Sequence, residues 1–165
     1  MRALGHPVHP ILVAFPIALL ALTPLFDGLS WLGIMADAAG AAYLCEAAGL
    51  IGGGLAIVTG FADFMKIPQS DKAAANVAII HASLALCMVS LFGVAFALRG
   101  PRTAAAGAGV LALEVGGAAL IGVTGWFGGH LVFGHGVGVG TRRAQTPELQ
   151  DVQPDEAPSP QRQAQ

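Results

Sequence analysis

Five histidines are the residues of this chain best suited to bind a metal ion or a cofactor. They are His6, His9, His81, His130 and His135. A neutral imidazole ligates haem iron and other transition metals, and it also carries protons near neutral pH. His81 stands out because it lies inside a long apolar run, and polar residues within membrane segments are candidates for function.

Two carboxylates also lie inside long apolar stretches. Glu46 precedes Asp63 by 17 residues, and Glu114 precedes His130 by 16. At the rise of a helix, each carboxylate should lie roughly 25 Å from the histidines. Such groups usually face the interior of a helix bundle, so Glu46 and Glu114 are candidates for a proton path. The alternative for Glu46 is that its side chain reaches out to the far membrane surface.

The composition indicates which kind of protein must position these residues. The 165 residues include 8 Lys and Arg, 10 Asp and Glu, and 55% hydrophobic residues. So few polar side chains cannot coat a water-soluble domain. The net charge of -2 excludes the basic stripe of a nucleic-acid binder, and no enzyme motif is present. The chain is therefore predicted to be an integral membrane protein in contact with a lipid bilayer.

Four stretches are long and apolar enough to cross a membrane. We expect an all-α, four-helix transmembrane bundle over residues 1–140, with spans at about 8–26, 40–62, 76–98 and 106–130. The first span contains prolines and is interpreted as a retained, kinked helix. No parallel internal repeat is evident. Residues 141–165 are rich in proline and glutamine and are predicted to form a disordered polar tail.

The distribution of basic residues predicts the orientation in the membrane. Four spans place both termini on one side, together with Arg2, Lys66, Lys72, Arg142 and Arg143, whereas Arg99 and Arg102 fall on the other. The positive-inside rule then places both termini in the cytoplasm. The histidines and Asp63 belong to this cytoplasmic membrane edge.

Small residues recur at helical spacing and indicate close helix packing. The pairs are Gly49 with Gly53, Ala118 with Gly122, and Gly125 with Gly129. Small residues let helix backbones approach each other within a membrane. Packing inside the bundle is the preferred interpretation, and a homo-oligomer joined through these faces is the alternative.

Several motifs resemble the bacterial membrane proteins of domain-of-unknown-function family 2231. The first runs from Gly5 to Leu19 and begins Gly-His-Pro-Val-His-Pro; the others are Thr59–Phe64, His81–Leu84 and Gly128–Val139. The resemblance covers residues 5 to 140 and implies a four-helix membrane domain. Relatives joined to Rieske-type or other redox modules imply electron transfer by association. The chain departs from a common form of the first motif, because Ala14 replaces a histidine.

Haem b or metal binding for electron transfer is the first functional hypothesis. His81 would be one axial ligand of a haem, and His9, His130 or His135 the other. Without haem, His6, His9, Asp63, His81 and His135 would form a site for a transition metal. A redox protein would then be the partner.

Two other functions are compatible with the same residues. A small proton-coupled transporter would use Glu46, Glu114 and the histidines as a relay. A non-catalytic membrane subunit or scaffold would use its small-residue faces to bind partner helices, and its histidines would be structural.

Overall fold

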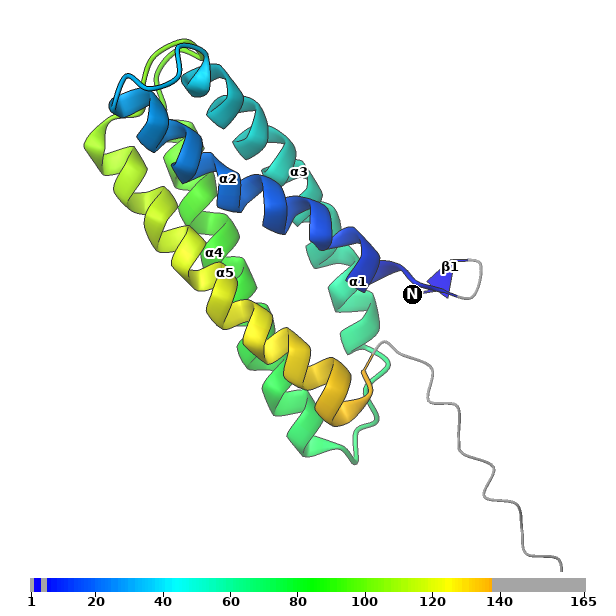
Figure 1. Ribbon diagram of the computed structural model, residues 1–165. Coiled ribbons are helices and arrows are strands. Elements are labelled where there is room, and N and C mark those ends of the chain that lie inside the picture. The colour runs from blue at the N-terminus through cyan, green and yellow to red at the C-terminus, as the bar shows by residue number, and fades with distance from the viewer. Residues whose placement is uncertain (1, 4–5, 138–165) are drawn as a thin grey trace, which may run out of the picture.

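The chain folds into four long apolar helices that are antiparallel in sequence order (Figure 1). The computed structural model describes residues 2–3 and 6–137. The helices are α1 (Val8–Leu12), α2 (Ala14–Trp31), α3 (Ala38–Phe64), α4 (Lys72–Leu98) and α5 (Ala108–His135). Because α1 and α2 form one apolar segment, there are four helices long enough to span a membrane in the described part. This confirms the predicted all-α membrane architecture, and the predicted tail lies outside the described residues.

Prolines shape the first helical segment. The regular helix is interrupted at Val13, between α1 and α2, although the Val13 amide still donates to the His9 carbonyl at 3.0 Å. Pro16 has no amide hydrogen and cannot continue the backbone ladder at this point. Ahead of α1, two-residue strands β1 (Arg2–Ala3) and β2 (His6–Pro7) pair in antiparallel register, a feature that the sequence did not predict.

The outer surface of the bundle is apolar, as contact with lipid requires. Ile51, Trp126 and Phe133 are 70%, 76% and 91% exposed. A continuous surface of this kind would be unstable in water, where large exposed apolar patches are rare. The exposed side chains therefore support the membrane location that the composition predicted.

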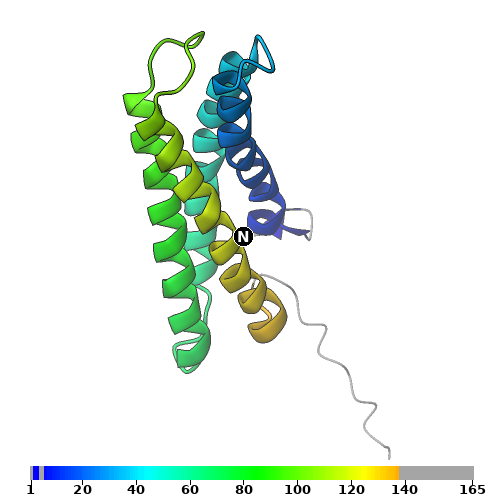
Figure 2. The same cartoon turned by 60° about the vertical axis from the view of Figure 1, so that its left-hand side comes forward.

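The four helices form two hairpins that pack side by side. α2 packs mainly on α3, and α4 mainly on α5, with fewer contacts across the pairs (Figure 2). The end with turns 32–37 and 99–107 is called the hairpin end. The opposite end, with the start of α1, turn 65–71 and the end of α5, is called the terminal end.

The second hairpin repeats the packing of the first. A position in α1 or α2 matches the position 72 residues later in α4, as 27 matches 99. A position in α3 matches the position 68 residues later in α5, as 46 matches 114. The matched pairs are His9 and His81, Leu20 and Phe92, Asp27 and Arg99, Glu46 and Glu114, Gly49 and Gly117, and Gly60 and Gly128. The expectation that no parallel repeat is evident was therefore wrong: the repeat lies in the matched positions of the two hairpins, and four of these six pairs are identical in residue type.

The matched glycines show the repeat most directly. A Cβ atom added at Gly49 would lie 2.7 Å from Leu20 Cδ2, and one added at Gly117 would lie 2.6 Å from Phe92 Cε2. Both glycines let a large side chain of the partner helix enter the core. Leu20 and Phe92 belong to one buried cluster with Met88, which joins the two hairpins.

Candidate functional site

Arg99 occupies the centre of the bundle at the hairpin end. It follows α4 directly, and its extended backbone, with ψ of 137°, ends the helix ahead of Gly100 and Pro101. The side chain is only 2% exposed. An arginine in a turn would normally reach water, so burial of this guanidinium requires negative partners.

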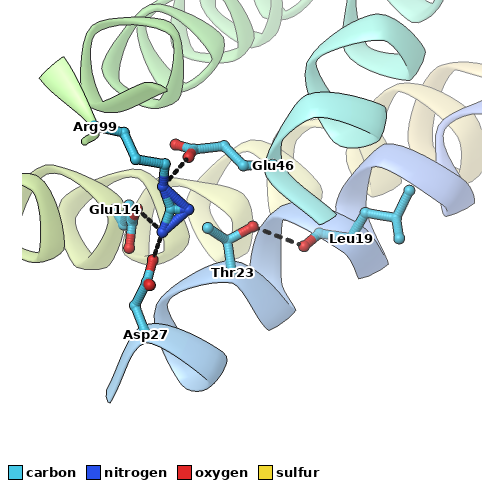
Figure 3. Close-up of polar contacts among 6 residues, drawn as sticks. All are labelled: Leu19, Thr23, Asp27, Glu46, Arg99 and Glu114. Atoms are coloured by element: carbon cyan, nitrogen blue, oxygen red, sulfur yellow. Dashed lines mark hydrogen bonds and ion pairs between the residues drawn. The ribbon is translucent and has the colours of Figure 1, made fainter. Parts of the chain in front are cut away.

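Three carboxylates surround the Arg99 guanidinium, one from each of the other long helices (Figure 3). Arg99 Nη2 donates a hydrogen bond to Asp27 Oδ2 on α2. Arg99 Nε lies 3.3 Å from Glu46 Oε2 on α3, and Nη2 lies 3.6 Å from Glu114 Oε1 on α5. All three carboxylate side chains are 0% exposed. These four residues are called the Arg99 cluster, and each hairpin supplies two of them.

The Arg99 cluster has more acidic groups than its single cation can balance. With all three carboxylates ionised, it would carry two excess negative charges inside the bundle. Within the described residues, no donor binds either oxygen of Glu46 or of Glu114, or Asp27 Oδ1. The carboxyl groups of Glu114 and Asp27 lie within hydrogen-bonding reach of each other. Buried ionised groups without a donor are costly. Binding of protons is the simplest chemistry that lowers this cost.

The position of two cluster members differs from the sequence prediction. Asp27 and Arg99 fall just outside the predicted spans 8–26 and 76–98, but α2 continues to Trp31 and both side chains are buried. Gly28, which follows Asp27, also lies within α2 and not in the turn. The alternative that Glu46 reaches the membrane surface is wrong, because Glu46 is 0% exposed.

His9 and His81 occupy matched positions nearer the terminal end, and each ring contacts a backbone carbonyl; His9 Nδ1 also lies 3.2 Å from Thr59 Oγ1. His9 Nδ1 lies 3.0 Å from the Ala56 carbonyl oxygen, and His81 Nδ1 lies 3.0 Å from that of Thr124. The residue four positions later is glycine in each case, Gly60 or Gly128, and lies against the imidazole ring. In a neutral imidazole, donation from Nδ1 to a carbonyl puts the lone pair on Nε2.

The remaining predicted ligands are His130, His135, Asp63 and His6. The ring centroids of His130 and His135 are 5.2 Å apart, and the two ring planes are nearly perpendicular. Asp63 pairs with Lys66 at 2.7 Å and interacts electrostatically with His9, as His81 does. The side chain of His6 lies outside the described part of the structure.

No group of three or more His, Cys, Asp or Glu residues that could hold a metal ion occurs among the described residues. Haem and metal ligation by the predicted histidines therefore stays a prediction.

The small-residue pairs differ in their surroundings. Gly49 and Gly53 pack against Leu20 and Val89 within the bundle, whereas Gly122, Gly125 and Gly129 face open space.

Comparison with known proteins places the chain in a family. The family model described as "Predicted membrane protein (DUF2231)" matches residues 5–141. The chain belongs to this family, as its motifs indicated. No curated protein and no solved structure matches the chain.

Proposed function

We propose that this member of the DUF2231 family is a small proton-coupled transporter whose proton site is the Arg99 cluster. The observation that carries the proposal is the complete burial of three carboxylates around one guanidinium, within four apolar helices. Ionisable groups inside a membrane are expensive and commonly mark proton relays. A purely structural ion pair would need only one carboxylate for its guanidinium.

The location of the cluster between two repeated hairpins supports a role in transport. Parallel repeats related by an axis along the membrane normal occur in secondary transporters, whose binding sites lie at the repeat interface. Asp27 and Glu46 come from the first hairpin, and Arg99 and Glu114 from the second. Charge in this cluster therefore acts directly on the contact between the two halves.

A change in protonation would alter how firmly the hairpins are joined at the hairpin end. Arg99 contacts both acidic residues of the first hairpin across the interface. A proton bound by the cluster removes excess negative charge and favours the closed arrangement. Its release restores repulsion between buried carboxylates, which favours separation of the hairpins. Coupling of proton binding to hairpin movement is the central claim of the proposal.

Proton flux into liposomes tests the proposal. The full-length chain is reconstituted with an internal pH-sensitive dye, and a pH gradient is imposed. We expect flux with the wild type and its loss with Glu114→Gln, which preserves shape and removes ionisation. Asp37→Asn is the matched control, because Asp37 is an exposed acidic residue of the hairpin-end turn. Equal flux with wild type and Glu114→Gln, or none with either, would contradict the proposal.

The bacterial inner membrane with both termini in the cytoplasm is the location we propose. Lys66 and Lys72 are exposed at the terminal end, where positive charge favours the cytoplasm. Burial of Arg99 removes one of the two basic residues counted on the opposite side, so only Arg102 is left there. The charge bias is therefore stronger than the sequence alone indicated.

Haem b or metal binding for electron transfer is the second candidate function. Support comes from His9 and His81, whose Nδ1 atoms contact backbone carbonyls, so that Nε2 of the neutral ring could ligate a metal. Histidine ligands of metals commonly bind a carbonyl through their other nitrogen. A reduced-minus-oxidised spectrum with metal analysis tests this function. Colourless, metal-free protein from cells supplied with haem and metals would contradict haem or metal binding. A redox partner would then not be needed.

A membrane subunit or scaffold is the remaining alternative. The open glycines Gly122, Gly125 and Gly129 on α5 would then bind a partner helix or a second copy of the chain. Replacing Gly125 with leucine would disrupt such an assembly. Loss of proton flux in Glu114→Gln but not in Gly125→Leu would instead favour the proton-coupled function.

A further inference from the structure

Asp27 and Glu114 approach the same nitrogen atom of Arg99, although they come from different hairpins. Asp27 Oδ2 accepts a hydrogen bond from Arg99 Nη2, and Glu114 Oε1 lies 3.6 Å from that nitrogen (Figure 3). Glu46 contacts Nε instead, at 3.3 Å. The carboxyl groups of Asp27 and Glu114 also lie within hydrogen-bonding reach of each other. One nitrogen of the guanidinium thus brings two acidic side chains together.

Two acidic groups this close need a proton between them. Ionised carboxylates only accept hydrogen bonds, whereas a protonated carboxyl group can donate one. The side chains of Asp27 and Glu114 are both 0% exposed, so bulk water does not weaken the repulsion between two negative charges there. A proton on one of the two groups removes this repulsion and replaces it with a hydrogen bond.

The contacts of the two side chains indicate which of them carries the proton. Asp27 Oδ2 accepts a charge-assisted hydrogen bond from Arg99, which favours the ionised form of Asp27. Within the described residues, no donor binds either oxygen of Glu114, so nothing comparable favours its ionised form. Asp27 Oδ1 has no donor there either and is available to accept a hydrogen bond from Glu114.

We propose that Glu114 carries the proton of the Arg99 cluster and donates it in a hydrogen bond to Asp27. The proposal rests on the proposed function and names the proton-carrying residue of its site. Among the described residues, the charged groups that face Glu114 are Asp27 from α2, Glu46 from α3 and Arg99 at the end of α4. The proton comes from water, and only the O–H bond of Glu114 forms on uptake and breaks on release. With the proton bound, Asp27 and Glu46 stay ionised against Arg99.

Infrared spectroscopy of the full-length protein identifies the residue that carries the proton. The protein is made by cell-free synthesis with glutamate or aspartate ¹³C-labelled in the side-chain carboxyl group, and is purified at neutral pH in a detergent without carbonyl groups. We expect a band of protonated carboxyl that shifts to lower frequency with labelled glutamate and stays in place with labelled aspartate.

Variants then assign the band to one glutamate and test its hydrogen bond. Glu114→Gln should remove the band, because it replaces one neutral group with another and leaves the charges of the neighbours unchanged. Glu46→Gln should retain it at full intensity. Asp27→Asn should shift or remove the band, because it replaces the ionised acceptor of the hydrogen bond. Asp37→Asn is the matched control at an exposed position and should leave the band as it is.

The outcomes separate this proposal from its alternatives. A band that shifts with labelled aspartate would place the proton on Asp27, and a band that weakens in Glu46→Gln would place it on Glu46; either result refutes the proposal. No band in the wild type would overturn the proposal even if the variants did not fold. An unaltered band in Asp27→Asn would refute the hydrogen bond. The expected bands without proton flux in liposomes would refute transport but retain the protonated Glu114, whereas flux that depends on Glu114 without the band would refute this inference alone.

Discussion

Replacement of Arg99 with methionine should destabilise the bundle strongly. Among the described residues, the guanidinium is the only cation that contacts Asp27, Glu46 and Glu114, and its side chain is 2% exposed. Removing one partner of a buried ion pair leaves uncompensated charge and costs about 3–5 kcal/mol. Because three carboxylates lose their cation here, we expect the upper part of this range. Methionine keeps the length and apolar stem of the side chain, so the loss reports on charge.

The free energy of unfolding is measured by titrating the protein from mild detergent into sodium dodecyl sulfate. Arg102→Met is the matched control, because Arg102 lies three residues later in the same turn and is exposed; it should change stability by less than about 0.5 kcal/mol. The Arg99 variant should regain stability as the pH falls, because its folded state then binds more protons than its unfolded state. Equal stability of the two variants would refute the view of Arg99 as a buried counterion.

Three further predictions follow from the repeat and from the histidine contacts. Gly117→Ala should destabilise the protein by about 1–3 kcal/mol, because its Cβ would lie 2.6 Å from an aromatic ring carbon, whereas Gly122→Ala meets open space and should be neutral in the same unfolding titration. Exchanging the charges of Asp27 and Arg99 in a double variant should restore much of the stability lost in either single variant, because the positions are matched; strictly additive losses would contradict this. His81→Ala should cost roughly 0.5–1.5 kcal/mol for its hydrogen bond, and an unchanged free energy of unfolding would count against the 3.0 Å contact.

The long helices could be predicted from the sequence, because apolar runs of membrane length have few alternative structures. The same reasoning located Glu46 and Glu114, since a carboxylate within an apolar run is conspicuous. Both side chains are buried in the bundle interior, where intramembrane carboxylates were expected to face. The histidine contacts were harder to predict from the sequence, because they depend on Gly60 and Gly128 in other helices.

Asp27 and Arg99 were missed for a physical reason. Each lies at the end of an apolar run beside glycine, where charge and glycine normally indicate a turn. Only the contact between the two hairpins buries them, and local sequence does not encode that contact. The signal available in the sequence was a shared separation: His9 and His81 are 72 residues apart, and so are Asp27 and Arg99. Matching identical residues at a constant offset, His9 with His81 and Glu46 with Glu114, would have revealed the repeat.

The distance between the two hairpin-end turns tests the coupling of proton binding to hairpin movement most directly. Met35→Cys and Thr103→Cys place spin labels on exposed positions of turns 32–37 and 99–107 once the native cysteines are replaced. Electron–electron resonance should give a distance that lengthens as the pH rises, because proton release restores repulsion within the Arg99 cluster. With Glu46→Gln and Glu114→Gln together, the distance should not respond to pH. An identical distance in the wild type at every pH would contradict the account.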